Sequence, residues 1–522
     1  MRLFADHSSL DRRAAAIMIG LFTAATIWFA WGAWQPLPVI QDEYSYVLQS
    51  RIFARGHWTE PPPPAQYPFQ QAHVLISPRL ASKYPPGHAL LMTPGTLLGV
   101  PWLAPIILSG IAGALVFLLI DQLYGSGCAL FGWACWLTDS INLRFRPGYY
   151  SEATSGLTWL LTWWFLLRWR RSSNPKDLAF LAIALGWCAI TRPLTAIAFA
   201  IPIGFAVLPR LIRERRWRNL GLAMVSGALV VSIMPLANWR TTGHPMKSAF
   251  ALYRDQYLPH DRLGFGLDST PPLERLTPVN ADVYNELAQV HVDHTLRTLP
   301  HVIYLRAAEL AVVEWEEWRV VLIPVALLGL TAATTEVWFA LACGGVLFVV
   351  YLFWAHWHGW TVYYLEAVPA LSALYAAGLY RIREWIRTRR PQLMRYATVL
   401  CVVATAAYTA NAIRVWRRNH IQLARSDTAF FQLTDSIPFR GAVIFVRYSP
   451  TQHPHTTVVQ NSVTLATDRF WIVNDDSSAN MSVLRAANGR VPMLYQEKGG
   501  VLTVYRTLLD SLRPEESAAG SK

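Results

Sequence analysis

The chain has 522 residues, of which 53% are hydrophobic, and a formal net charge of +13. The hydrophobic share exceeds the roughly 45–50% of soluble domains, which excludes an ordinary soluble protein and predicts a polytopic membrane protein. The Arg residues gather in short segments between apolar runs, and no RNA- or DNA-binding motif accompanies them. We therefore interpret the basic charge as membrane topology and expect no nucleic-acid partner.

The first apolar run extends from Ala14 to Trp34. It is too long for a signal-peptide core and lacks a small-residue cleavage site, which predicts a retained first helix. Runs of about 17–25 apolar residues can cross a bilayer as a helix. Eleven such spans are predicted, at residues 14–34, 101–123, 127–143, 152–168, 178–191, 194–209, 219–238, 318–334, 336–354, 361–379 and 396–414. The run from Gly87 to Val100 is short and contains Pro94, so we expect a partly embedded helix there.

Basic residues in the short connections predict the orientation, because cytoplasmic loops carry an excess of Arg and Lys. Four basic segments are expected on the cytoplasmic side: residues 168–176, 210–218 and 381–395, and the N-terminus with Arg2, Arg12 and Arg13. With an odd number of spans, the loop 35–100, the loop 239–317 and the tail after Arg414 then lie on the extracytoplasmic face. We expect a bacterial inner membrane.

An acidic pair, Asp42-Glu43, begins the first outward loop. It opens a helical pattern that continues to Arg55 and is ended by Gly56. Charged side chains near the hydrocarbon layer are costly and usually face a cavity or pathway, so this pair predicts a functional site. The alternative is a pair of solvated acids that stabilise a helix N-terminus through its dipole.

The tail, residues 416–522, has a different pattern from the rest of the chain. Strands are predicted at Ala442–Val446, Thr456–Leu465, Phe470–Val473, Pro492–Gln496 and Val501–Tyr505, and helices at Asp427–Ser436 and Ala479–Ala487. This alternation predicts a small soluble α/β domain. The five cysteines lie in apolar runs without a Cys-x-x-Cys pair, so neither a disulfide framework nor a zinc site is indicated.

Four motifs follow one another on the predicted outward face. They are Asp42-Glu43, Lys83-Tyr84-Pro85-Pro86, Glu152 and Thr191-Arg192-Pro193. In order and spacing they resemble the GT-C glycosyltransferases, in particular the protein O-mannosyltransferases and the lipid A aminoarabinose transferase. The resemblance covers about the first 240 residues. It implies a GT-C transmembrane domain at 1–415 and an extracytoplasmic α/β domain at 416–522.

The resemblance implies an inverting transfer of a hexose or pentose from a polyprenyl-phosphate donor. The acceptor would be a hydroxyl of a lipid, polysaccharide or protein outside the membrane. Asp42 matches the family's catalytic acid and Glu43 its neighbour. A carboxylate there would accept the proton of the attacking hydroxyl. Adjacent side chains on a helix diverge by about 100°, so we expect Asp42 rather than Glu43 to be the base.

Two cations are candidates for binding the donor phosphate. Lys83 aligns with a family lysine that binds this group, followed by Tyr84 in the same motif. Arg192 lies outward against the positive-inside trend, which indicates an anionic partner. Two alternatives remain: Lys83 extends to lipid head groups, and Arg192 binds a lipid head group.

Further candidates lie near these residues. Glu152 would orient the acceptor, coordinate a metal or pair with Arg146. His356 and His358 lie two apart in an aromatic segment, where they would ligate a metal or contact a sugar or head group. A divalent cation is therefore left open as a cofactor.

Two other classes of protein remain as alternatives. A transporter or flippase of lipid-linked glycans would carry ionisable residues in mid-span and broken helices in paired halves. Here the charges gather at span ends, and no internal repeat is evident. A non-catalytic membrane scaffold is the second alternative, and an outward loop without acids would favour it.

Overall fold

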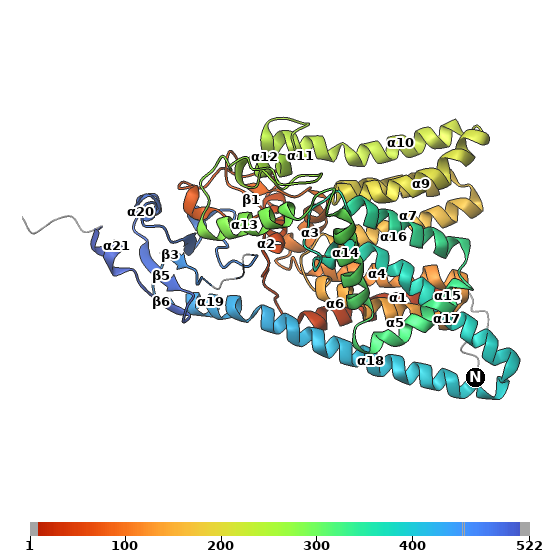
Figure 1. The fold of residues 1–522 in the computed structure, drawn as a ribbon. Helices are drawn as coiled ribbons and strands as arrows, with labels where there is room; N and C mark the ends of the chain where they lie inside the picture. Colours follow the sequence, from red (N-terminus) through yellow and green to blue (C-terminus); the bar gives the residue numbers. More distant parts are fainter. Residues whose placement is uncertain (1–8, 451–452, 454, 512–522) are drawn as a thin grey trace, which may run out of the picture.

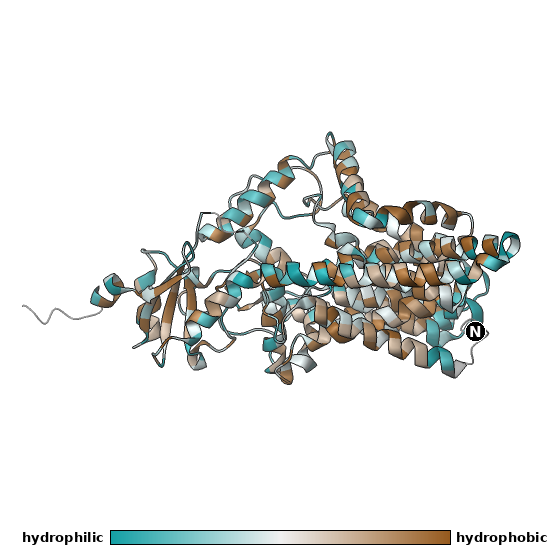
Figure 2. Cartoon of the chain, turned by 90° about the horizontal axis from the view of Figure 1, so that it is seen from below, coloured by the Kyte–Doolittle hydropathy of each residue, from teal (hydrophilic) through white to brown (hydrophobic). Residues whose placement is uncertain are grey.

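The computed structural model describes residues 9–450, 453 and 455–511, so the predicted basic residue Arg2 lies outside it. The molecule is elongated, with a bundle of apolar helices at one end and a small sheet at the other (Figure 1). Hydrophobic residues are concentrated along the bundle, as Figure 2 shows. This architecture confirms the predicted fold class, a helical membrane protein with a small C-terminal α/β domain.

The bundle is formed by the segments that the hydropathy pattern predicts as spans. Its helices are α1 (Ser9–Trp31), α4 (Leu103–Tyr124), α5 (Ser126–Leu137), α7 (Glu152–Ser172), α8 (Pro175–Ala189), α9 (Pro193–Arg213), α10 (Trp217–Val231), α11 (Ile233–Thr242), α15 (Leu322–Leu330), α16 (Thr335–Tyr351), α17 (Val368–Arg389) and α18 (Met394–Leu423). Within the described residues, six helical segments are long and apolar enough to cross a membrane by themselves.

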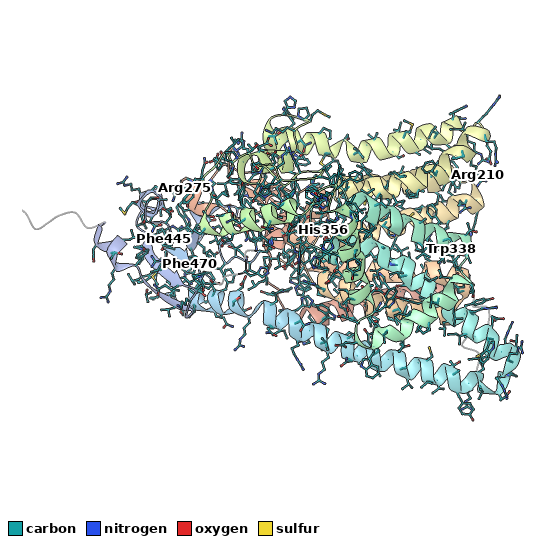
Figure 3. All side chains as sticks on the ribbon, in the orientation of Figure 1. Arg210, Arg275, Trp338, His356, Phe445 and Phe470 are labelled. Carbon is teal, nitrogen blue, oxygen red and sulfur yellow. The ribbon has the colours of Figure 1, made fainter. Side chains whose placement is uncertain are left out.

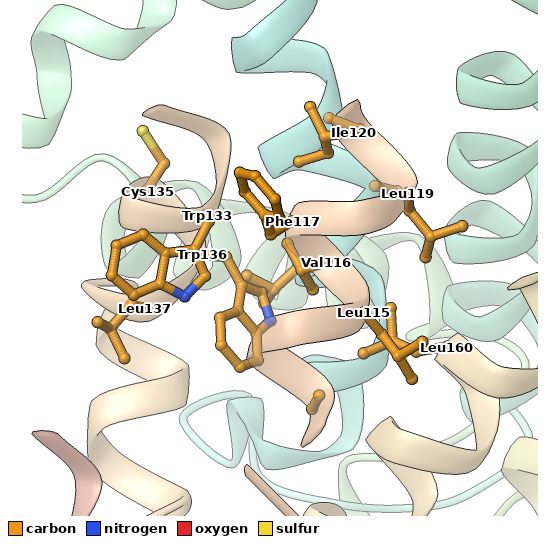
Figure 4. Close-up of a cluster of buried hydrophobic side chains, with 14 of the residues drawn as sticks. Leu115, Val116, Phe117, Leu119, Ile120, Trp133, Cys135, Trp136, Leu137 and Leu160 are labelled. Carbon is orange, nitrogen blue, oxygen red and sulfur yellow. The ribbon is translucent and has the colours of Figure 1, made fainter. Parts of the chain in front are cut away.

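Large aromatic side chains fill the centre of the bundle. Trp136 of α5 packs against Val116 and Phe117 of α4, and Leu160 of α7 belongs to the same buried cluster (Figure 4). Small residues allow other helices to approach closely: a Cβ at Gly20 of α1 would lie 3.1 Å from the Gly110 carbonyl oxygen of α4. Close backbone approach at small residues is the usual way in which membrane helices pack.

Two predicted spans do not form a single spanning helix: 127–143, and 318–334, where α15 has only 9 residues. The segment 127–143 is not one helix but two, α5 and α6 (Ser140–Phe145). Asp139 separates them, because its side chain accepts hydrogen bonds from the backbone N–H groups of Ile141 and Asn142 and so starts a new helix. At 1.5 Å per residue, the 12 residues of α5 reach only about 18 Å, too short to cross a hydrocarbon layer of about 30 Å.

A buried arginine holds α6 in place. Arg319, in the 3-10 helix η2 (Glu317–Val321), lies 3.0 Å from the Asp139 carboxylate and 2.5 Å from that of Glu314. The Tyr375 hydroxyl donates to the same Glu314 oxygen over 2.6 Å. All four side chains are buried, so the charges are compensated by one another rather than by water.

The basic connections lie together at one end of the bundle. Their contacts are those of Arg12 with Asp121, Arg171 with Gln122, Arg210 with the Arg170 carbonyl and Arg383 with Cys128. Arg210 marks this end in Figure 3, and the described chain begins there as well. The loops predicted to face outward, which are called the outward loops below, gather at the opposite end of the bundle.

The outward loops build a layer over that opposite end of the bundle. It consists of α2 (Gln41–Ala54), η1 (Tyr67–Phe69), the hairpin of β1 (Val74–Leu75) and β2 (Ala81–Ser82), α3 (Gly87–Leu97), α12 (Ala249–Tyr257), α13 (Pro278–Val292), α14 (Leu299–Glu314) and η3 (Thr361–Ala367). The expected short helix after Gly87 and the helix after Asp42 are both present.

The tail forms a four-stranded sheet in the order β4-β3-β5-β6. Its elements are α19 (Arg425–Asp435), β3 (Ala442–Arg447), η5 (Leu465–Thr467), β4 (Phe470–Asn474), α20 (Asn480–Ala487), β5 (Val491–Gln496), β6 (Val501–Val504) and α21 (Arg506–Ser511). β3 pairs in parallel with β4 and β5, and β6 is antiparallel to β5. The predicted strand at Thr456–Leu465 is wrong, because this segment crosses to the outward loops, where Thr456 forms a single bridge with Ile40.

Helix α18 leads from the bundle towards this sheet and is followed by α19 and then by β3. It runs along one side of the molecule and continues past residue 416, where the sequence pattern places the start of the C-terminal domain (Figure 1). The domain also docks directly on the outward loops. The Asn474 side chain donates to the carbonyls of Pro68 and Gln70, and Arg275 lies 2.7 Å from Asp476.

Candidate active site

A cavity of about 1470 Å³ lies between the outward end of the bundle and the loops that cover it. Its wall includes the N-termini of α2, α7 and α9, the turn after β2, and His455 of the C-terminal domain. Asp42, Lys83, Tyr84, Glu152 and Arg192 all line it. Five of the nine residues predicted for the site thus meet in one space.

Asp42 occupies the first turn of α2, with about a third of its side chain exposed. One carboxylate oxygen accepts a hydrogen bond from the Tyr84 hydroxyl, and the other lies 3.4 Å from Nε2 of His73. Burial raises the pKa of Asp42, but His73 and Tyr84 outweigh burial and hold the pKa well below its usual range. The carboxylate is therefore ionised and open to the cavity.

Glu43 points away from the cavity. Its carboxylate accepts hydrogen bonds from the backbone N–H groups of Val39, Ile40 and Tyr149, at 2.9 to 3.1 Å. Burial raises the pKa of Glu43 to about 7, although these three donors oppose the shift. The side chain caps the start of α2 and attaches it to the loop before α7. Of the predicted acidic pair, only Asp42 reaches the cavity.

Lys83 follows β2 and is buried against Asp261. Their Nζ and Oδ2 atoms are 3.5 Å apart, and both side chains are under 10% exposed. The rings of Tyr84, Phe250 and Tyr253 surround the ammonium group at 4.8 to 5.2 Å from its nitrogen. Aromatic faces and a carboxylate both attract positive charge, so these groups hold the ammonium group in this position.

Arg192 precedes α9 and pairs with Glu152 at the start of α7. A second guanidinium nitrogen donates to the Tyr351 hydroxyl over 3.1 Å, and Tyr351 in turn contacts the Thr195 hydroxyl. Arg192 is therefore fixed at the cavity wall by groups from two helices, α7 and α16. An ion pair between Glu152 and Arg146 was one of the expected alternatives. Glu152 pairs with Arg192 instead.

Arg146 itself lies outside the cavity wall. It is 1% exposed, stacks on Trp136 at 4.7 Å and donates from Nε to Asn142. It packs inside the bundle, where a Cβ at Gly156 would lie 3.0 Å from its Nη2 atom. The structure thus places Arg146 behind the cavity wall rather than in it.

The motif after β2 is held beside Arg192 by a close backbone contact. The Gly87 N–H donates to the Ile190 carbonyl over 2.8 Å. A Cβ at Gly87 would overlap the Thr191 hydroxyl, so only glycine fits. This contact brings the turn of Lys83 and Tyr84 next to the connection between α8 and α9.

The predicted pair of histidines does not converge on a metal. His356 is buried, and its two ring nitrogens lie 2.8 Å from the Trp357 carbonyl and 3.1 Å from the Tyr364 hydroxyl. Its position at the centre of the molecule is labelled in Figure 3. The His358 ring packs on Trp357 instead. No group of three His, Cys, Asp or Glu side chains in the described part of the chain is arranged to hold a metal ion.

Several wall residues are absent from the residues predicted for the site. His73 lies next to Lys83 because the β1–β2 hairpin pairs Val74 with Ser82, and a hairpin prediction would have found this contact. Asp261 and His455 reach the cavity from loops far along the chain, so spacing contains no information about them. Asp261 is 178 residues from Lys83, as the difference of their numbers shows.

The cavity also has apolar walls. On one side it is lined by Ile197 of α9, Val231 of α10 and Met234 of α11, and the first two are 54% and 41% exposed. On another it reaches Trp416 and Leu423 of α18. The charged centre therefore adjoins helix faces of the kind that contact lipid.

Comparison with known proteins agrees with this architecture. The chain is similar to ArnT from Cupriavidus metallidurans, in the apo state (15% identity, TM-score 0.58, 96% of this chain and 95% of that chain). It is also similar to the same protein bound to undecaprenyl phosphate (14% identity, TM-score 0.57, 94% and 93% coverage). This chain has the GT-C fold. The resemblance inferred from the motifs is thereby confirmed for the fold.

A family model described as dolichyl-phosphate-mannose-protein mannosyltransferase matches residues 84–239. This stretch of the GT-C fold includes Tyr84, Glu152 and Arg192, whereas Asp42 and Lys83 precede it. The chain also shows a weaker similarity to the arabinosyltransferase EmbB from Mycobacterium smegmatis (14% identity, TM-score 0.41, 73% and 32% coverage). No curated protein sequence matches it.

Proposed function

We propose that the protein is an inverting glycosyltransferase that uses a polyprenyl-phosphate sugar as donor. The observation that carries the proposal is the meeting of an ionised carboxylate, Asp42, with two cations, Lys83 and Arg192, in one cavity with apolar walls. A lipid-linked sugar requires this combination, because its tail is apolar, its phosphate is anionic and its transfer needs a base. The similar ArnT structure holds undecaprenyl phosphate, which supports a donor of this class.

In this mechanism Asp42 takes the proton of the acceptor hydroxyl as its oxygen attacks the anomeric carbon. The bond from that carbon to the phosphate oxygen breaks, and its electron pair stays on the phosphate. Lys83 and Arg192 stabilise the negative charge that develops there. Because attack and departure take place on opposite faces of the sugar, the anomeric configuration inverts.

The reaction would take place on the extracytoplasmic face. The three basic connections and the basic start of α1 lie at the end of the bundle away from Asp42, and basic segments stay in the cytoplasm. This supports a cytoplasmic N-terminus, an extracytoplasmic C-terminal domain and a place in the inner membrane. The products of the following experiment identify the donor sugar as a hexose or a pentose. They also identify the acceptor as a lipid, a polysaccharide or a protein.

The test uses purified protein in liposomes with a pool of polyprenyl-phosphate sugars and a membrane extract as acceptor. Mass spectrometry quantifies free polyprenyl phosphate, and NMR of the product gives the anomeric configuration. Asp42→Asn is compared with Asp255→Asn, a matched change in the ion pair with Lys247 outside the cavity. We expect Asp42→Asn to lose at least about 100-fold in rate, as removal of a general base does, and Asp255→Asn to keep the wild-type rate.

Other outcomes would overturn this proposal in different ways. Equal donor consumption by wild type and Asp42→Asn would remove Asp42 as the base. Movement of intact donor across the bilayer without its consumption would favour a flippase. A product with retained configuration would contradict direct inversion.

A further inference from the structure

Both cations proposed to bind the donor phosphate are already paired with a carboxylate. Lys83 lies against Asp261, and Arg192 against Glu152. All four side chains line the same cavity and are less than 10% exposed. Together with Asp42, these four side chains in their ionised forms carry a net charge of minus one before any donor binds.

We propose that Asp261 and Glu152 are counter-ions that lower the affinity of the site for its lipid-phosphate product. This inference rests on the proposed transferase function. It assigns the two acids a role in product release rather than in the chemical step. They would make the site bind the singly charged phosphodiester in preference to the more highly charged phosphate monoester. Neither acid would contact the acceptor hydroxyl.

The reason lies in the charge balance of the reaction. The donor is a phosphodiester with one negative charge. When its bond to the sugar breaks, the phosphate keeps the electron pair and becomes a monoester, with a charge of roughly −1.5 to −2 at neutral pH. The proton of the acceptor hydroxyl passes to Asp42 and then to water. The product is thus more anionic than the donor, and two unpaired cations in a buried site would bind it more tightly than the substrate.

The geometry sets up competition between phosphate and acid. Asp261 Oδ2 is 3.5 Å from Lys83 Nζ, so Asp261 and a phosphate oxygen would share the same ammonium group. Charges interact strongly at such distances in a site shielded from water, and the repulsion between acid and phosphate grows with the charge of the phosphate. The acids therefore disfavour the monoester product more than the diester donor.

The aromatic cage allows this competition without loss of Lys83 from the site. Three rings hold the ammonium group in place at 4.8 to 5.2 Å, so its position does not depend on Asp261 alone. Arg192 is likewise held by Tyr351 in addition to Glu152. Neutralising either acid should leave the cation in place and available for phosphate.

The test measures binding of undecaprenyl phosphate to the full-length protein in nanodiscs, without any acceptor. The variants are Asp261→Asn and Glu152→Gln, with Asp261→Glu as the conservative rescue and Asp255→Asn as the control outside the cavity. We expect each neutral variant to bind about tenfold more tightly, which is a modest part of the interaction of buried charges. The rescue and the control should keep wild-type affinity, and Lys83→Met should bind more weakly.

A second readout separates this role from a structural one. In turnover assays the neutral variants should show a lower KM together with a lower kcat, and stronger inhibition by added undecaprenyl phosphate. A merely structural acid would lower both affinity and rate. Unchanged or weaker binding in folded Asp261→Asn and Glu152→Gln, with wild-type protein binding normally, would overturn this inference alone. Absence of binding and of turnover in wild type would overturn the transferase proposal itself.

Discussion

The Tyr44 hydroxyl donates to the Asn461 carbonyl over 2.6 Å and accepts from the Asn461 N–H over 3.0 Å. Tyr44 lies on the helix that carries Asp42, and Asn461 belongs to the segment between β3 and β4. The backbone N–H of Gln41 also donates to the His455 carbonyl over 2.9 Å. The C-terminal domain thus fixes the start of the helix that presents the proposed base.

Replacing Tyr44 with Phe should loosen this attachment. The change leaves the Asn461 backbone groups buried without a partner, a cost of about 1–3 kcal/mol. We expect faster hydrogen exchange at residues 455–474 and a lower unfolding temperature. Tyr304→Phe is the control, because Tyr304 is 67% exposed on α14. Equal exchange in both variants would show that the hydroxyl does not hold the domain.

The imidazole of His73 should set the lower pH limit of activity. His73 and Tyr84 hold the pKa of Asp42 well below its usual range against the effect of burial. Without the imidazole the pKa of Asp42 rises, so Asp42 becomes protonated at a higher pH. The acid limb of the kcat/KM profile therefore shifts to higher pH. We choose His73→Asn because the backbone φ of 67° is tolerated by Asn.

The pH profile of His57→Asn provides the comparison for this prediction. His57 is half exposed and pairs with Glu60 outside the cavity wall. Its acid limb should coincide with that of wild type. A His73→Asn profile with an unmoved acid limb would mean that Tyr84 alone controls Asp42.

Glu43 should make the stability of the protein depend on pH. Its pKa in the folded state is about 7, above its ordinary value, so folding favours the protonated form. The stabilisation is full below the ordinary pKa and is lost as the pH rises through 7. Thermal unfolding between about pH 5 and pH 8 should therefore show a smaller slope in Glu43→Gln than in wild type.

Glu274→Gln, at an exposed position, serves as the control for this slope. It should reproduce the wild-type dependence on pH. If Glu43→Gln keeps the full slope, the pH dependence arises from another group. Its turnover at a single pH should change less than that of Asp42→Asn, since Glu43 faces away from the cavity.

The crossing of α15 and α17 should not tolerate an extra methyl group. A Cβ at Gly378 would overlap the Val325 carbonyl oxygen, whereas a Cβ at Gly345 in α16 meets no atom within 4 Å. Gly378→Ala should destabilise the bundle by about 1–3 kcal/mol through overpacking. Gly345→Ala should be neutral or slightly stabilising, because Ala has the higher helix propensity. Thermal unfolding in detergent distinguishes them, and equal midpoints would contradict the close crossing.

The sequence was informative where the physics is local. Hydropathy located the bundle, the distribution of arginines located its two ends, and short motifs located Asp42, Lys83, Glu152 and Arg192 around one cavity. The pattern Thr138-Asp139-Ser140 also contained the helix break that hydropathy missed, because an Asp before a helical run is a common N-cap.

Pairings across the fold could not be predicted in this way. Lys83 meets an acid from the loop 239–317, and Arg192 meets Glu152, because helices and loops distant in sequence pack together. The β-rich composition of Thr456–Leu465 predicts a strand, but contacts with α2 determine its path instead. Single-sequence patterns describe which residues favour an element and contain no information about the partner that element will find.

The pairing of Tyr44 with Asn461 has a consequence for biosynthesis. The two residues are separated by 417 positions, so at about 5–20 residues per second the ribosome needs roughly 20–80 s to reach the second after making the first. During that interval α2, which carries Asp42, has already left the ribosome. The segment around Asn461 that attaches α2 to the C-terminal domain has not yet been synthesised. A nascent chain would therefore reach the membrane with the start of α2 not yet attached, and this attachment would form only after the last part of the chain has folded.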